Sequence, residues 1–227
     1  MSKKEYTIAL AGNPNTGKTT LFNLLTGLNQ HTGNWPGKTV TRSEGKFSYL
    51  SNKYKIIDLP GTYSLLSRSQ DEEVARNFIL FDKPDITLVI VDATALERNL
   101  NLAIQVLQIS HRVIVCLNLI DEAQRKGITI DHKKLSQQLG IPVIPMAATK
   151  GRGKDELLKT IHDVINGDIQ FTPYKMNYPE SIKKDIEILS QKLKSTYPNL
   201  NNAEWIALRL IEGDISIHNY LLEQEIA

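Results

Sequence analysis

The sequence contains one cysteine, Cys116, among 227 residues. A single cysteine excludes an intrachain disulfide and a metal site built from several cysteines, and it is typical of a reducing, cytosolic compartment. No apolar run approaches the roughly 18 residues that a membrane-spanning helix needs, so these residues alone cannot form a channel. Charge of one sign is also lacking, because 27 basic and 25 acidic residues leave a net charge of only +2. This balance points neither to nucleic acid nor to an acidic membrane as a partner.

The order of apolar runs and helical patterns predicts an α/β fold. Two nearly all-apolar runs, 86–91 and 113–117, are typical of central strands in a parallel sheet covered on both faces. The other predicted elements are strands at 6–11, 39–50, 53–59 and 142–145 and helices at 18–26, 95–108, 131–139 and 155–165. Because two of these strands form a hairpin, the expected sheet is doubly wound and mostly parallel, with one antiparallel strand. Residues 28–38, rich in Asn, Gly and Pro, are expected to form an exposed loop.

The pattern changes after Gly167, which divides the chain into three predicted parts. Residues 1–167 are expected to form one α/β domain, 168–179 a linker, and 180–227 a small all-α domain. The last 55 residues carry 6 basic and 8 acidic side chains. A part of this size is marginal as an independent domain, so we expect it to pack against the α/β domain. Its helical pattern continues to Ala227, so we expect the sequence to be a domain excised from a longer chain.

Residues 12–19 match the pattern G-x-x-x-x-G-K-[ST] between a predicted strand and a predicted helix. Glycines in such a loop let backbone N–H groups converge on phosphate oxygens, and the helix N-terminus adds partial positive charge. Lys18 is expected to reach the β- and γ-phosphates, and the hydroxyl of Thr19 to bind Mg²⁺. The predicted polyphosphate site consists of Gly12, Asn13, Pro14, Asn15, Thr16, Gly17, Lys18, Thr19 and Thr20.

A second phosphate element follows at the end of the predicted strand 53–59, in the sequence Asp-Leu-Pro-Gly. An aspartate at a strand end can hold magnesium through water, which is the role predicted for Asp58. The backbone N–H of Gly61 can reach the γ-phosphate. Taken alone this sequence is a common turn, but downstream of a phosphate-binding loop it indicates a nucleotide site.

Asn118, Leu119 and Asp121 lie at the carboxyl end of an apolar strand, where open α/β sheets bind ligands. A carboxylate can accept hydrogen bonds from N1 and the 2-amino group of guanine, and adenine lacks this pair of donors. Asp121 is therefore predicted to select guanine, and Asn118 to tie the base loop to the phosphate loop. Leu119 replaces the usual lysine of N-K-x-D, so one wall of the base site loses an aliphatic stem. The loop after the last strand could offer a backbone N–H to guanine O6 from Ala147, Ala148 or Thr149.

These four elements, in this order, resemble the translation-factor-like branch of small GTPases. More specifically, nearly the whole chain resembles the N-terminal cytosolic domain of the ferrous iron transport protein B family. The resemblance rests on the sequences GNPNTGKTTLFN at 12–23, GNWPGKTV at 33–40, DLPGTYSL at 58–65 and WIALRLIEGD at 205–214. It implies a Ras-like P-loop GTPase fold and a GTPase module that controls a membrane-embedded iron(II) transporter.

The resemblance also implies roles for particular residues. Thr39 matches a threonine that closes on magnesium when GTP is bound, and Asn15 matches an asparagine that holds K⁺ in potassium-activated members. The implied switch loops are 28–42 and 58–70, and 180–227 resembles a helical domain that inhibits GDP dissociation. The implied catalytic residues are Asn15, Lys18, Thr39 and Gly61, and the implied ligands are Thr19, Thr39 and Asp58 for Mg²⁺ and Asn15 for K⁺.

Thr62 stands where Ras-type enzymes have a glutamine that orients the attacking water. We therefore expect hydrolysis to be slow and to depend on backbone positioning and cations, with turnover faster in K⁺ than in Na⁺. The expected partners are GTP, GDP and the transmembrane iron-permeation domain of the same polypeptide. The expected location is the cytoplasmic face of the inner membrane. Self-association is possible, and no nucleic-acid partner is expected.

Two alternative functions share the phosphate-binding loop. A soluble ribosome-assembly GTPase usually appends a basic RNA-binding module, whereas the last 55 residues here have a net charge of −2. A GTP-binding switch with negligible hydrolysis is the second alternative, which Thr62 keeps open. Two further residue groups have alternative interpretations. Trp35 either gates nucleotide or anchors a mobile loop, and residues 150–154 either touch the base or form a solvated loop, which is the expectation.

Overall fold

The computed structural model describes residues 5–66, 69–198 and 200–226. Residues 1–4 of the predicted α/β domain and residues 67–68 of the second predicted switch loop lie outside this description. Residues 199 and 227 of the predicted helical domain also lie outside it. In the described part of the chain, no helix combines the length and apolarity required to cross a membrane.

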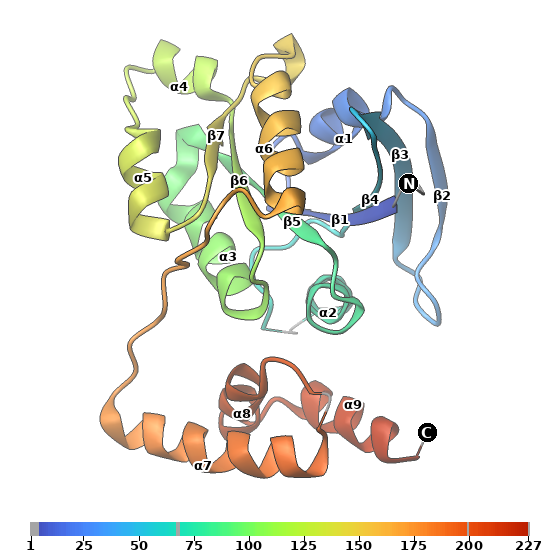
Figure 1. The fold of residues 1–227 in the computed structure, drawn as a ribbon, viewed down its shortest axis with the longest axis vertical. Helices are drawn as coiled ribbons and strands as arrows, with labels where there is room; N and C mark the ends of the chain where they lie inside the picture. Colours follow the sequence, from blue (N-terminus) through green and yellow to red (C-terminus); the bar gives the residue numbers. More distant parts are fainter. Residues whose placement is uncertain (1–4, 67–68, 199, 227) are drawn as a thin grey trace.

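The described residues contain a seven-stranded sheet in the order β2-β3-β4-β1-β5-β6-β7 (Figure 1). Its strands are β1 (Glu5–Gly12), β2 (Gln30–Asn34), β3 (Thr41–Tyr49), β4 (Asn52–Asp58), β5 (Ile86–Asp92), β6 (Val113–Asn118) and β7 (Val143–Pro145). Strand β3 runs antiparallel to both of its neighbours, and every other neighbouring pair is parallel. The predicted mostly parallel sheet with one antiparallel strand is therefore confirmed.

Helices cover both faces of the sheet, which is why the central strands β5 and β6 are apolar and buried along their lengths. One face packs against α1 and α6 through residues such as Phe22 and Ile161. The other face packs against α2 to α5 through residues such as Val74 and Val106. The helices of this part are α1 (Lys18–Thr26), α2 (Gln70–Asn77), α3 (Leu96–Ile109), α4 (Ile120–Arg125), α5 (His132–Leu139) and α6 (Lys154–Asn166).

Three further helices form a C-terminal helical segment: α7 (Glu180–Thr196), α8 (Ala203–Ile211) and α9 (Ile215–Ile226). Residues 167–179, which join it to α6, contain neither helix nor strand. The helical segment lies beside α2 and α3 (Figure 1), and the buried Trp205 and Ile206 of α8 belong to the same hydrophobic core as those helices. The side-chain amide of Asn202 donates to the backbone oxygen of Ile109 at 2.9 Å. A segment this small thus gains burial by sharing the core of the α/β part.

Two predictions made from the sequence are wrong in detail. Residues 28–38 are not wholly loop, because Gln30–Asn34 pair with β3 as the edge strand β2. All five of these residues are exposed, so backbone pairing forms the strand without an apolar side chain to signal it.

The sequence analysis also predicted neither α2 nor α4. Helix α2 begins with Gln70, Asp71, Glu72 and Glu73 and continues into the π-helical turn Phe78–Asp82.

Candidate nucleotide-binding site

The predicted phosphate-binding loop connects the end of β1 to the start of α1 at the carboxyl edge of the sheet. Gly17 has a φ of +86°, and a Cβ atom there would lie 2.3 Å from Nδ2 of Asn118. A Cβ atom on Gly12 would lie 3.1 Å from the backbone oxygen of Ile90. The Asn118 side chain therefore excludes a Cβ atom at Gly17, and the neighbouring strand β5 leaves little room for one at Gly12.

Buried residues hold the inner part of the phosphate-binding loop together, and the residues at its rim are exposed. The hydroxyl of Thr16 donates to the backbone oxygen of Asn13 at 2.8 Å, and both residues are buried. Pro14, Asn15 and Thr19 are exposed, and Asn15 adopts a left-handed backbone with a φ of +64°. Thr20 lies in the first turn of α1 and is partly buried. The exposed rim is the surface that a phosphate chain could reach.

The two predicted phosphate elements meet through an ion pair. The ammonium of Lys18 donates a hydrogen bond to Oδ1 of Asp58 at the end of β4. Burial raises the pKa of the Asp58 carboxyl, and the positive charge of Lys18 opposes this shift. Strands β1 and β4 are parallel neighbours, so the sheet itself brings these side chains together.

The segment after Asp58 lies directly against the phosphate-binding loop. A Cβ atom on Gly61 would lie 3.5 Å from Pro14, and the N–H of Thr62 donates to the backbone oxygen of Gly12 at 3.3 Å. Thr62 is buried, and its hydroxyl donates to the backbone oxygen of Ser64 at 2.9 Å. Because the Thr62 hydroxyl is already bonded within its own turn, it is poorly placed to orient a water molecule.

Asn118 joins the phosphate-binding loop to the loop after β7. Its Nδ2 donates to the backbone oxygen of Thr16 at 2.9 Å, and its Oδ1 accepts from the N–H of Ala148 at 3.0 Å. The side chain is buried and uses both of its polar atoms in these bonds. Ala147 is buried beside it, whereas Thr149 is exposed. The base-side loop and the phosphate-side loop are therefore held in a fixed relation by one residue.

Asp121 lies in the first turn of α4, directly after Leu119, which adopts a φ of +60°. Its Oδ2 lies 2.7 Å from Nζ of Lys150, and this hydrogen bond is the main reason that the Asp121 pKa is lowered. Lys150 was expected to be part of a solvated loop. Its side chain is indeed 65% exposed, but it pairs with the carboxylate predicted to select guanine. The sequence analysis missed this pair because the two residues are separated by α5 and β7.

The first predicted switch loop packs on α2. Trp35 is buried, and its ring meets that of Phe78 edge to face with the centroids 5.4 Å apart. The ammonium of Lys38 lies 3.0 Å from Oε2 of Glu73. The hydroxyl of Thr39 donates to Oε1 of Gln70 at 3.5 Å. Of the two interpretations of Trp35, the contacts favour an anchor, although the residues around it form an ordered turn.

The donor types in the site fit a hard cation bound together with phosphate. Thr19 offers a hydroxyl and Asp58 a carboxylate, which are oxygen ligands of the kind that Mg²⁺ prefers. The exposed side chain of Asn15 offers an amide oxygen at the rim of the same loop. Across the described ranges no group of three His, Cys, Asp or Glu side chains could hold a metal by itself.

Comparisons with known proteins point to one family. The sequence profile of "Ferrous iron transport protein B" matches residues 6–161. The Fe(2+) transporter FeoB of Shigella flexneri is 41% identical over 222 residues, which cover 96% of this chain. Those residues cover 28% of the relative, so the chain spans little more than a quarter of its length.

Solved structures of the same family are similar over almost the whole chain. The cytosolic domain of the T. maritima FeoB iron transporter in one GDP form has a TM-score of 0.88 and 34% identity. That comparison covers 98% of this chain and 86% of the other. The GMPPNP form of the same domain has a TM-score of 0.87 and 35% identity, with coverage of 96% and 85%. These two structures are therefore forms of the T. maritima domain with a guanine nucleotide.

Proposed function

The chain belongs to the ferrous iron transport protein B family, and on that premise we propose that it is the GTP-binding and GTP-hydrolysing module of a ferrous iron transporter. The observation that carries the proposal is the position of Asn118. Its two hydrogen bonds hold the phosphate-binding loop and the base-side loop together. A phosphate cradle joined to a carboxylate at a second loop is the arrangement that a guanine nucleotide needs.

On the phosphate side, the backbone N–H groups of residues 15–17 and the ammonium of Lys18 would bind the phosphate oxygens. Thr19 and Asp58 would hold Mg²⁺, which neutralises negative charge on the β- and γ-phosphates when bound. For Lys18 to reach the γ-phosphate, its ion pair with Asp58 must loosen. The same movement would free the carboxylate for the metal.

On the base side, Asp121 would accept hydrogen bonds from N1 and the 2-amino group of guanine. The N–H of Ala147 donates to the backbone oxygen of Arg152 and that of Ala148 to Asn118, so the N–H of Thr149 is the one that would donate to O6. Because adenine cannot supply the same two donors, ATP would leave a mostly covered carboxylate unpaired. GTP and GDP are therefore the proposed ligands.

Hydrolysis is proposed to be slow, because the Thr62 hydroxyl is bonded to Ser64 and no glutamine replaces it. Lys18, Gly61 and the Thr39 hydroxyl would stabilise charge on the transferring phosphate together with K⁺ at Asn15. Thr39 would have to exchange its hydrogen bond with Gln70 for a place at the metal. The hydrogen bond between the Thr62 hydroxyl and Ser64 also favours the second candidate function, a GTP-dependent switch with negligible turnover.

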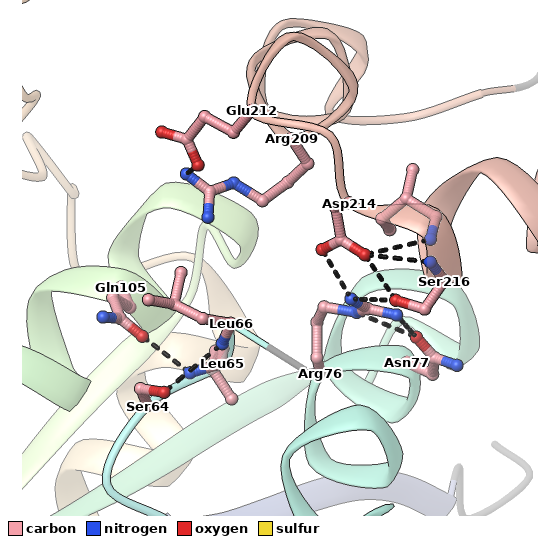
Figure 2. A network of polar contacts seen from close by, with 11 residues as sticks. Ser64, Leu65, Leu66, Arg76, Asn77, Gln105, Arg209, Glu212, Asp214 and Ser216 are labelled. Atoms are coloured by element: carbon pink, nitrogen blue, oxygen red, sulfur yellow. Dashed lines mark hydrogen bonds and ion pairs between the residues drawn. The ribbon is translucent and has the colours of Figure 1, made fainter. Parts of the chain in front are cut away.

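The helical segment is proposed to restrain release of GDP and to pass the nucleotide state to a transmembrane iron-permeation domain at the cytoplasmic face of the inner membrane. Figure 2 shows its connection to α2, in which the buried guanidinium of Arg76 lies 3.1 Å from Asp214 and 3.0 Å from the hydroxyl of Ser216. Nearby, the N–H of Leu65 donates to Gln105 of α3 at 2.7 Å. The bonds of Arg76 therefore join α2 to the helical segment, and the bond of Leu65 joins the second predicted switch region to α3.

The test is phosphate release from GTP and ATP, measured for the wild-type chain and for Asn15→Ala in KCl and in NaCl with magnesium present. We expect release from GTP alone, faster in KCl, with the potassium advantage lost in Asn15→Ala. Equal turnover of ATP and GTP would contradict the guanine assignment. GTP binding without measurable release in KCl would favour the switch function, and equal rates in the two salts would remove the role proposed for Asn15.

A further inference from the structure

Lys150 lies at the base site but belongs to none of the motifs that predicted that site. It ends the turn Ala148–Lys150, which carries the Thr149 N–H proposed for guanine O6. Gly151 follows with a φ of +68°, so the chain reverses immediately after the lysine. This geometry turns the side chain back across the loop, and its Nζ lies 2.7 Å from Oδ2 of Asp121.

The side chains of Asp121 and Lys150 differ strongly in their exposure to solvent. The side chain of Asp121 is only 15% exposed, whereas that of Lys150 is 65% exposed. The ammonium therefore contacts a carboxylate that is mostly covered, and it can itself move into solvent. An exposed ion pair of this kind is weak and readily broken, so it weakens the binding of a ligand at Asp121 without preventing it.

Guanine and Lys150 use the same acceptor. The base must present two neutral N–H donors to the two oxygens of Asp121, and each of those hydrogen bonds is weaker than one made by an ammonium. Building on the proposed function, we propose that Lys150 is a specificity-determining residue of the base site, whose ammonium competes with guanine for Asp121. Departure of the base is assisted because Lys150 can restore the pair as the guanine hydrogen bonds break.

The same ammonium affects discrimination between related bases. Xanthine has a carbonyl oxygen in place of the 2-amino group, and that oxygen would face an oxygen of Asp121. A lysine between them can donate to both, which reduces the repulsion. Lys150 therefore makes the site bind guanine less tightly and exclude xanthine less strictly than Asp121 alone would.

The test uses Lys150→Met, which keeps an unbranched apolar stem without the charge, and Lys150→Arg, which keeps the charge. Lys154→Met is the matched control, because Lys154 begins α6 four residues after Lys150 and makes no ion pair within the described residues. Equilibrium binding and dissociation of fluorescent GDP and XDP would be measured for the full 227-residue chain at fixed ionic strength. We expect Lys150→Met to bind GDP roughly two- to five-fold more tightly, to release it more slowly and to raise the preference for GDP over XDP. Lys150→Arg and Lys154→Met should remain close to wild type.

The outcomes separate this inference from the proposed function. Wild-type protein that binds neither GDP nor GTP would overturn the proposed function, and this inference with it. If wild type binds GDP and Lys150→Met binds it equally or more weakly, the competition is refuted while the guanine site stands. An unchanged ratio of GDP to XDP affinity in Lys150→Met would likewise overturn the role in specificity.

Discussion

At the scale of single residues, the phosphate-binding loop and Asn118 lie so close together that a larger residue at their contact would not fit. Asn118 uses both polar atoms of its amide to join two loops. Gly17 leaves room for that amide, because a Cβ atom would approach its nitrogen to 2.3 Å. The sequence motif names Gly17 and Lys18 for their effect on phosphate. The structure adds a second reason for the glycine, which is the passage of the Asn118 side chain.

Gly17→Ala tests this second reason. The substitution should destabilise the chain by about 1–3 kcal/mol, because it combines a left-handed backbone with displacement of Asn118. It should also abolish nucleotide binding, since the two loops lose their bridge. Gly27→Ala is the matched control, because Gly27 has a φ of +62° but no neighbour within 4 Å of a Cβ atom. Urea unfolding and fluorescent GDP binding would be compared, and equal effects of the two variants would contradict the proposed bridge.

At the scale of elements, the apolar pattern of the sequence predicted the central strands of the sheet but not its edge strand β2. Strands β5 and β6 could be predicted because burial on both faces demands continuous apolar side chains. Strand β2 could not, because its exposed residues pair only through backbone groups. Helix α2 was hidden by its acidic first turn, which includes Glu73, although such residues stabilise a helix N-terminus. The pair of Lys150 and Asp121 was hidden because it joins residues far apart in sequence.

Helix α2 holds the first switch loop through the pair of Lys38 and Glu73 beside Trp35. Glu73→Lys should loosen that loop, since it places two ammonium groups together, and the loss is expected to be about 0.2–1 kcal/mol for a partly exposed pair. In a background in which Trp205 is replaced by Phe, emission from Trp35 should shift to longer wavelength and become more accessible to acrylamide.

The charge-reversed double variant Lys38→Glu with Glu73→Lys should restore the emission of Trp35. Asp71→Lys makes the same charge change in the first turn of α2 at an exposed position, so it controls for the helix dipole. Emission that responds equally to Asp71→Lys and Glu73→Lys would show that the pair does not hold the loop.

At the scale of the whole molecule, α2 contacts both the first switch loop and the helical segment. Its Arg76 is completely buried, and burial lowers the pKa of the guanidinium while Asp214 opposes the shift. A buried arginine needs its partner far more than an exposed one does, because the charge cannot return to water. Beyond it, the rings of Phe81 and Tyr220 stack with the centroids 3.6 Å apart. The helical segment is therefore fixed to the part of the chain that the nucleotide is proposed to move.

Asp214→Asn tests whether this attachment restrains the nucleotide. Asparagine keeps a side-chain oxygen that can accept from the N–H groups of Ser216 and Ile217 at the start of α9, while its NH₂ group replaces the oxygen that accepts from Arg76. The charge and the acceptor opposite Arg76 are therefore both removed. Removing the carboxylate opposite a buried guanidinium should cost roughly 3 kcal/mol of unfolding free energy, and release of fluorescent GDP should become faster because α2 loses its restraint. Asp185→Asn on the exposed face of α7 is the control and should change neither quantity. If Asp214→Asn lowers stability in urea but leaves GDP release at the wild-type rate, the attachment supports the fold without regulating the site.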